Sequence, residues 1–393
     1  MIGVGQDWQR AAIGSGGAMF VALGLGRFSY TVMVPALAES GQLGASEAGT
    51  IGWINLAGFL IGAFASETAR RLALRHEISV KALLGGAVWL SVLALAASAV
   101  PYGFHWLAFW RGLLGLTAGL IMVQSLALTT AHVPERFRPR AAAYVFAGVG
   151  LAIFLSGTLM PLLLKLGLDW AWIGIALVGL CGAAVTHWAW RAETAAPPEG
   201  TPTASRVVGD RRMSALILAH FCFAFGIVPH TIYWVDFIAR DLQQGVASGG
   251  LHWSVAGVFA VLGPWLTAGL AERIGTAWAL VVAFLCLCIG IGGPALTSVW
   301  PVIWLSTVIF GAQPGLSTLI TARTRDLTER DAMPRAMRLM ILASGAGAAV
   351  GGFVVTRLFH ATGDYAMLFL LGGGAMALGA LLTLPPRRGV RRL

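Results

Sequence analysis

The chain of 393 residues is 57% hydrophobic and only 11% charged, with a mean hydropathy of +0.78. Soluble domains carry roughly a quarter charged residues, so this composition excludes an ordinary globular protein and indicates a chain dissolved in lipid. The net charge of +10 lies mostly in short segments between apolar runs rather than in a basic patch with interleaved aromatics, which argues against a nucleic-acid partner.

Twelve apolar runs of roughly 20 residues or more follow one another along the chain. The first six lie near 11–38, 47–66, 79–100, 105–131, 141–163 and 170–190, and the second six near 213–239, 251–271, 276–294, 299–322, 336–358 and 365–385. One long polar segment, at 191–212, separates the two sets and has the composition of a flexible linker. The sequence therefore predicts an all-α membrane protein with an N-terminal six-helix half (1–190), a linker (191–212) and a C-terminal six-helix half (213–393).

The basic residues of the connecting segments predict the orientation. With the N-terminus inside, 22 of the 27 Lys and Arg residues fall in segments predicted to be cytoplasmic, and three fall on the outer side. This bias follows the positive-inside rule, so both termini and the linker are expected in the cytoplasm. The first apolar run is too long for the h-region of a cleavable signal peptide.

Four segments carry a family resemblance. They are GLGRFSYTVMVPAL (24–37) and SEAGTIGWINLAGFLIGA (46–63) in the first half, and VPHTIYWVDFIARDL (228–242) and HWSVAGVFAVLGPWLTAGLAERIG (252–275) in the second. The chain resembles the YbfB/YjiJ-type branch of the major facilitator superfamily. The resemblance implies a fold of twelve helices in two halves around a midplane site, a transporter role and a bacterial inner-membrane location, but no particular substrate.

A superfamily motif, Gly-x-x-x-Asp-Arg-x-Gly-Arg-Arg, is partly kept between the second and third helices and again between the eighth and ninth. In the first copy Ser66 stands where Asp is expected and Glu67 where the next Arg is expected. The resemblance implies that charges at these helix ends latch one face shut. The latch residues would be Gly62, Glu67, Arg70, Arg71, Glu272, Arg273 and Gly275. The fourth helix carries the related motif of an arginine and spaced glycines at Arg111, Gly112, Gly115 and Gly119.

Arginines within the predicted spans are the strongest candidates for a binding role. Mid-helix arginine costs about 2.5–3.5 kcal/mol on insertion scales, so such residues usually face the bundle interior or a water-filled cavity. A rise of 1.5 Å per residue places Arg27, Arg111 and the amide of Asn55 in the outer half of their helices, within reach of one cavity if these helices are neighbours. Alternatively, Arg27 is a structural cation that caps carbonyls or pairs with Glu39 or Glu47. Helical spacing predicts one shared face for Gly24, Arg27, Phe28, Thr31 and Pro35.

Two amides, Gln124 and Gln313, interrupt apolar runs deeper in the membrane. Each is expected either to line the transport pathway or to make an interhelical hydrogen bond. His230 is a further candidate for the pathway, because imidazole titrates close to physiological pH, with Tyr233 as a wall beside it. Pro229 is expected to break the helix next to this histidine.

Apart from Glu47, the first residue of its run, Asp236 is the only acid within a predicted span. It is a candidate for proton coupling together with His230. The alternative is a local ion pair with Arg240, four residues further along the helix.

Enzyme and metal signatures are missing from the sequence. It contains no HExxH, GxSxG or GxxxxGK[ST] motif, so neither an enzyme, a cofactor site nor an ATPase is predicted. The four cysteines lie in apolar runs without a CxxC. His220 with Cys222, and Cys286 with Cys288, are two residues apart on helices and point about 200° apart, so neither pair chelates a metal alone.

Two intramembrane arginines against one acid favour an anionic organic solute such as a carboxylate. We therefore expect a monomeric secondary transporter whose partners are a small-molecule substrate, protons or another coupling ion, and the lipid bilayer. The expected substrate-binding residues are Arg27, Asn55, Arg111, Gln124, His230, Tyr233 and Gln313. Two alternatives stay open: efflux of hydrophobic drugs, suggested by 15 Trp and 19 Phe, and a non-transporting receptor or assembly factor on a transporter fold.

Overall fold

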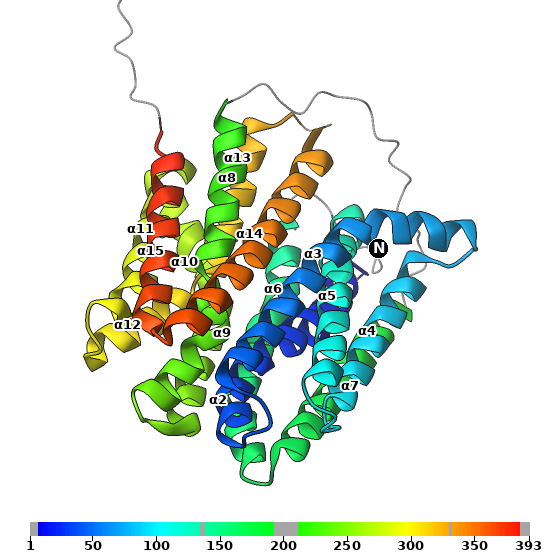
Figure 1. Ribbon diagram of the computed structural model, residues 1–393. Helices are drawn as coiled ribbons and strands as arrows, with labels where there is room; N and C mark the ends of the chain where they lie inside the picture. The colour runs from blue at the N-terminus through cyan, green and yellow to red at the C-terminus, as the bar shows by residue number, and fades with distance from the viewer. Residues whose placement is uncertain (1–6, 134–137, 192–210, 330–331, 386–393) are drawn as a thin grey trace, which may run out of the picture.

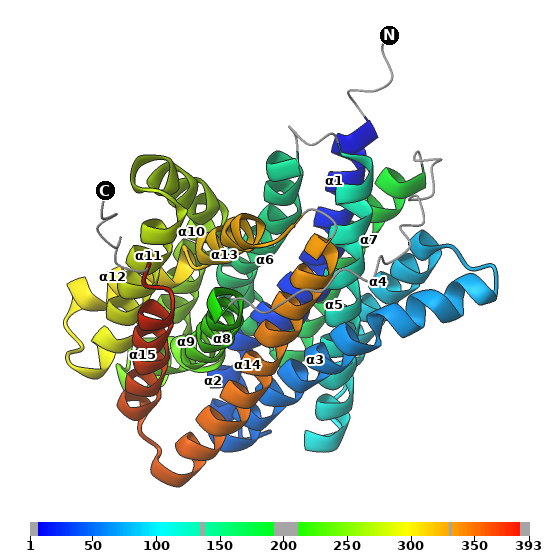
Figure 2. The same ribbon diagram turned by 90° about the horizontal axis from the view of Figure 1, so that it is seen from above.

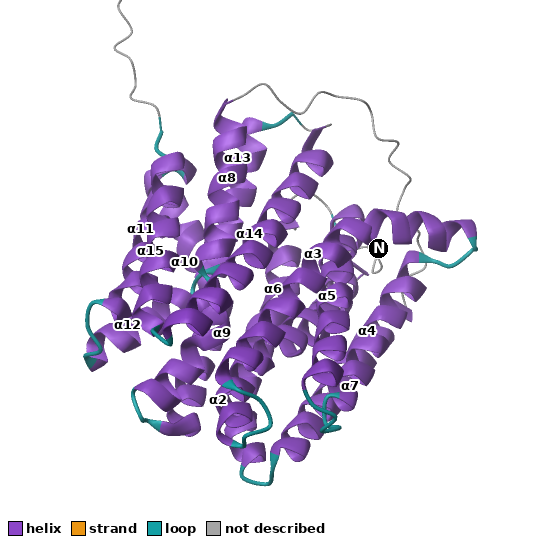
Figure 3. Ribbon diagram, in the orientation of Figure 1, coloured by secondary structure: helices purple, strands orange, loops and turns teal. Residues whose placement is uncertain are grey.

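The computed structural model describes residues 7–133, 138–191, 211–329 and 332–385, and within these ranges the chain forms helices and no strand (Figure 3). Eleven helical stretches in the described ranges are long and apolar enough to cross a membrane. A twelfth is obtained if Trp300–Gly311 and Pro314–Leu327, which meet at a bend of 41°, count as one span. Helices suit this composition because they satisfy every backbone polar group internally in lipid.

The first part of the chain forms seven α-helices and one π-helical segment. In order they are α1 (Asp7–Met19), the π-helical η1 (Phe20–Phe28), α2 (Ser29–Glu39), α3 (Ala45–Arg75), α4 (Val80–Ala97), α5 (Phe104–His132), α6 (Arg138–Leu164) and α7 (Leu168–Arg191). The elements α1, η1 and α2 are continuous and form one span from Trp8 to Glu39.

The second part begins with a broken helix. It consists of α8 (Arg211–Gly226), α9 (Val228–Asp236) and the π-helical η3 (Phe237–Asp241), followed by α10 (Gly245–Ile274), α11 (Thr276–Gly292), the 3₁₀ turn η4 (Gly293–Ala295), α12 (Trp300–Gly311), α13 (Pro314–Leu327), α14 (Met333–Thr362) and α15 (Tyr365–Leu382). The break between α8 and α9 falls just before Pro229, as the sequence predicts, because proline has no N–H to donate.

The helices of residues 7–191 lie on one side of the molecule and most of those of 211–385 on the other (Figures 1 and 2). The contacts that join the two sets include α6 with α10, α3 with α14, α2 with α9, α2 with α10, and α3 with α9. Large apolar side chains such as Phe64, Leu93 and Trp265 are exposed on the outer surface, which suits a surface in contact with lipid tails.

Glycines allow α3 and α5 to pack with their backbones in contact. A Cβ atom on Gly58 or Gly62 of α3 would collide with a carbonyl oxygen of α5, and a Cβ on Gly115 or Gly119 of α5 would collide with one of α3. Close backbone approach at small residues is a general means of helix association in membranes. This seam fixes the positions of Asn55 on α3 and Arg111 on α5.

Candidate functional site

Two arginines meet where η1 packs against α5 and α6. The side chain of Arg111 is 1% exposed, and its Nη2 donates to the carbonyl oxygen of Arg27 over 3.5 Å. Its guanidinium lies 4.4 Å from the ring centroid of Tyr30, a cation–π distance. Nε and Nη1 of Arg111 are buried and find no hydrogen-bond partner among the described residues.

Arg27 lies in the π-helical segment η1, near its end. Its guanidinium carbon is 5.3 Å from the ring centroid of Phe28, and its Nε and Nη2 are buried with no hydrogen-bond partner in the described ranges. The ion pairs found in those ranges include neither Arg27 nor Arg111. The expected alternative of a pair with Glu39 or Glu47 is therefore not observed.

The π-helix changes the period at which side chains of η1 share a face, so the shared face expected at α-helical spacing stays a prediction. A Cβ on Gly24 would collide with Ala152 of α6, whereas the hydroxyl of Thr31 donates to the carbonyl of Thr231 on α9. The π pattern of i→i+5 hydrogen bonds departs from the 3.6-residue period assumed from the sequence. π segments inside α-helices frequently lie at functional sites.

Asn55 and Gln124 both make hydrogen bonds between α3 and α5. The Asn55 side chain donates to the carbonyl of Arg111 over 2.8 Å, and that of Gln124 donates to the carbonyl of Ser66 over 3.1 Å. Both side chains are buried. Asn55 therefore contacts the backbone of Arg111 and holds it in place.

His230 lies in a buried aromatic pocket formed by α9, α12 and α15. Its Nε2 is 2.8 Å from the hydroxyl of Ser306, and its ring stacks on Trp234 with centroids 4.3 Å apart. The rings of Phe310 and Phe369 lie 5.1 and 5.0 Å away. Nδ1 of His230 is buried without a hydrogen-bond partner among the described residues.

Tyr233 and Gln313 do not join His230 in one polar cluster. The Tyr233 ring packs against Phe359 and Tyr365, and its hydroxyl occupies the space next to Gly49 of α3. Gln313 is half-buried at the bend between α12 and α13.

Asp236 is fully buried and has two partners. Nη1 of Arg240 lies 3.2 Å from its Oδ1, and the hydroxyl of Tyr365 donates to its Oδ2 over 2.6 Å. The local ion pair that the sequence offered as an alternative is thus present. Tyr365, which the sequence analysis did not single out, is a third member of this buried group.

A second buried histidine, His252 of α10, escaped the sequence analysis. Its Nδ1 is 2.7 Å from the hydroxyl of Thr307, which also accepts from Nε1 of Trp234 over 3.2 Å. Its ring stacks on Trp304 at 3.8 Å between centroids. Because it is only the second residue of the apolar run at 251–271, it was indistinguishable from a polar residue at a helix end.

Contacts between distant segments bring the arginine pair and the histidines near each other. Trp253, next to His252, donates from Nε1 to the carbonyl of Phe28 over 3.1 Å. Its ring also stacks on Phe310, which contacts His230. One aromatic side chain therefore connects the π-helical segment of Arg27 with the histidine pocket.

Six of the seven expected latch residues lie on helices rather than in loops, and the seventh, Gly275, is the C-cap of α10. α3 continues to Arg75, and Glu67 pairs with Arg70 at 2.9 Å and with Arg71 at 2.8 Å. Such i,i+3 and i,i+4 pairs support a helix, which explains why α3 outlasts the predicted apolar run. Glu272 and Arg273 lie exposed in the last turn of α10, which ends at Ile274 and is capped by Gly275 with φ of 81°. They form no ion pair in the described part of the chain.

Among the described residues, no group of three or more His, Cys, Asp or Glu side chains is placed to hold a metal ion. The candidate site consists of the guanidinium groups of Arg27 and Arg111, the imidazoles of His230 and His252, and the aromatic rings around them.

Comparison with known proteins identifies a matching family and a related protein. The model of the family described as "Uncharacterised MFS-type transporter YbfB" matches residues 19–384. A Haemophilus influenzae protein named "Putative metabolite transport protein" is 26% identical over 238 residues, which cover 56% of this chain and 55% of that protein. The match thus spans about half the length of that relative.

Proposed function

Since this chain belongs to the YbfB-type family of the major facilitator superfamily and is a multi-pass protein of the inner membrane, we propose that it moves a small organic anion by alternating access. The proposed topology has twelve membrane-spanning helices in two halves, 1–190 and 213–393, with the linker 191–212 and both termini in the cytoplasm. The distribution of basic residues supports this orientation.

The observation that carries the anion proposal is the arginine pair. The side chain of Arg111 reaches the backbone of Arg27, and four guanidinium nitrogens of these two permanent cations are buried and unpaired among the described residues. Arginine presents donors in a planar fork that matches a carboxylate in two-point geometry. In this proposal Asn55 positions Arg111 and does not contact the substrate.

Proton coupling is proposed for the second half of the chain. His230 and Asp236 were the predicted candidates, and His252 joins them because adjacent hydroxyls on α12, Ser306 and Thr307, bind the two imidazoles. Imidazole changes charge close to physiological pH, so protonation of either ring would alter its bond to α12.

The test is uptake into proteoliposomes after a thermal-stability screen of organic acids, sugars, amino acids and lipophilic cations on purified protein. We expect stabilisation by carboxylates, and substrate flux that Arg27→Ala abolishes although the variant still folds and inserts. Normal flux by Arg27→Ala, or stabilisation by lipophilic cations alone, would refute the anion proposal.

A further inference from the structure

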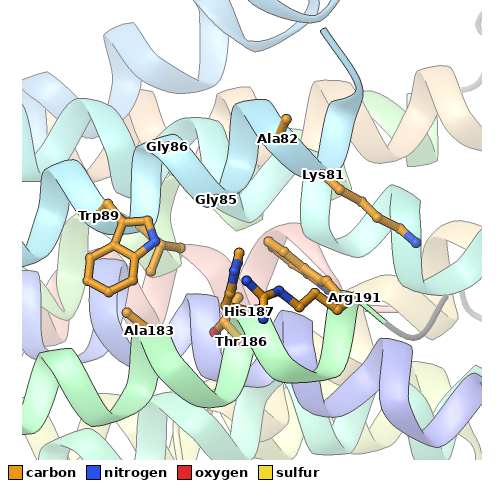
Figure 4. Close-up of a pocket in the computed structure, with 11 residues that line it drawn as sticks. Lys81, Ala82, Gly85, Gly86, Trp89, Ala183, Thr186, His187 and Arg191 are labelled. Carbon is orange, nitrogen blue, oxygen red and sulfur yellow. The ribbon is translucent and has the colours of Figure 1, made fainter.

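A cavity outside the candidate site lies between α4 and α7. Its volume is about 350 Å³, which falls in the range of small-molecule sites. One end is lined by Lys81 of α4 and by His187 and Arg191 of α7 (Figure 4). None of the eleven lining residues is acidic.

The other end of the cavity is apolar and has room for a hydrocarbon chain. Gly85 and Gly86 of α4 face open space, since a Cβ on either would meet nothing within 4 Å. Ala183 of α7 and Trp89 of α4 complete this end. Trp89 lies eight residues beyond Lys81, about 12 Å deeper at the helical rise.

The cavity opens onto the lipid-facing surface. Trp89 is 43% exposed, and the neighbouring apolar side chains Leu93 and Val185 are also exposed on these two membrane-spanning helices. The basic end lies at the start of α4 and the end of α7, next to the linker. In the proposed orientation this end is at the cytoplasmic surface of the membrane.

We propose that this cavity binds an anionic phospholipid of the cytoplasmic leaflet. Lys81, His187 and Arg191 bind the headgroup phosphate, and one acyl chain lies along Gly85 and Gly86 towards Trp89. Basic pockets between membrane helices on the cytoplasmic side suit such headgroups. A soluble anion would use only the basic end, so the apolar end favours a lipid.

The test is lipid retention by the purified, delipidated full chain, measured by native mass spectrometry and thermal melting. Phosphatidylglycerol or cardiolipin should bind and raise the melting temperature, whereas phosphatidylethanolamine and inorganic phosphate should not. Each basic residue near a membrane surface contributes about 1 kcal/mol, or about fivefold in affinity. The double variant Lys81→Gln/Arg191→Gln should thus bind phosphatidylglycerol about 30-fold more weakly.

A second variant separates this site from general surface charge. Gly86→Leu keeps every basic residue but fills the apolar end, and it should also lose the bound lipid. The matched controls are Gly374→Leu, at an exposed glycine of α15 that likewise faces open space, and Lys165→Gln, at the opposite end of the membrane span. Both should bind as the unchanged protein does.

Equal binding of phosphatidylethanolamine and phosphatidylglycerol would overturn the proposal. Unchanged binding of phosphatidylglycerol by Gly86→Leu would also overturn it. So would a protein that binds inorganic phosphate but no lipid, or a dimer in which the second copy of the chain covers the cavity. Because binding is measured without flux, none of these outcomes bears on the transport proposal, and a failed transport assay leaves the lipid site testable.

Discussion

Replacement of Arg111 by methionine separates a functional arginine from a structural one. Methionine keeps most of the side-chain length while removing the charge, which limits the change in volume. On insertion scales, loss of a mid-helix arginine returns about 2.5–3.5 kcal/mol. The variant loses two interactions. One is a cation–π contact with Tyr30 at 4.4 Å, worth roughly 0.5–2 kcal/mol, and the other is a long hydrogen bond of 3.5 Å to the Arg27 carbonyl.

The balance of these two terms favours the variant by roughly 0.5–3 kcal/mol, which the long hydrogen bond reduces. We therefore expect Arg111→Met to melt a few degrees higher in detergent, by scanning fluorimetry, and to have lost substrate-dependent stabilisation and flux. Arg357→Met is the matched control, because Arg357 also lies over an aromatic ring, Phe353 at 5.5 Å, but is exposed. Its melting temperature and flux should stay close to those of the unchanged protein. If Arg111→Met melts lower by several degrees, the arginine is a brace and the functional argument fails.

Three further predictions concern the seam, the buried acid and the second histidine. Gly62→Ala should destabilise the protein by about 1–3 kcal/mol, seen as a lower melting temperature, because its Cβ would collide with the Leu116 carbonyl. Tyr365→Phe should cost about 1–3 kcal/mol of thermal stability, because it removes a donor from the buried carboxylate of Asp236. His252→Asn should abolish uptake driven by a pH gradient but preserve exchange of substrate across the membrane.

Each of these variants has a control elsewhere in the chain. Gly269→Ala adds a Cβ that meets nothing within 4 Å, and Tyr102→Phe changes a tyrosine that is 73% exposed. His105→Asn removes an exposed imidazole. The reasoning would be contradicted if a control variant lost as much stability or uptake as the variant with which it is compared. It would also be contradicted if His252→Asn kept uptake driven by a pH gradient.

Most of the helical organisation could be predicted from the sequence because long apolar runs in lipid have few structural options. The described helices follow the predicted runs closely, and the break before Pro229 was predicted from its missing N–H. The two π-helical segments could not be predicted. The periodicity of apolar residues shows which side chains are buried, but it does not show whether a backbone N–H bonds to the carbonyl four or five residues earlier. The length of α3 was underestimated, since the ion pairs of Glu67 extend it beyond its apolar part.

The candidate site was predicted in part. Charge in an apolar run identified Arg27, Arg111 and Asp236, and the helical rise placed Asn55 beside the arginines. The hydrogen-bond partners of the buried histidines and of Asp236 were missed. These partners, Ser306, Thr307 and Tyr365, are of common residue types in membrane helices, and only the packing of distant segments brings them to the histidines and the acid. The choice for Gln124 between a pathway position and a hydrogen bond between helices likewise needed the geometry of α3 and α5.

The seam between α3 and α5 also limits how this protein can diverge. At Gly58, Gly62, Gly115 and Gly119 the neighbour that fills the place of a side chain is a carbonyl group, which no substitution elsewhere can shrink. Substitution of any of these four glycines requires the two helices to move apart. Such a movement would displace Arg111 from the Arg27 backbone. Related chains that have changed their substrate should therefore still carry glycine at these four positions, because the seam is a condition for any chemistry at the arginine pair.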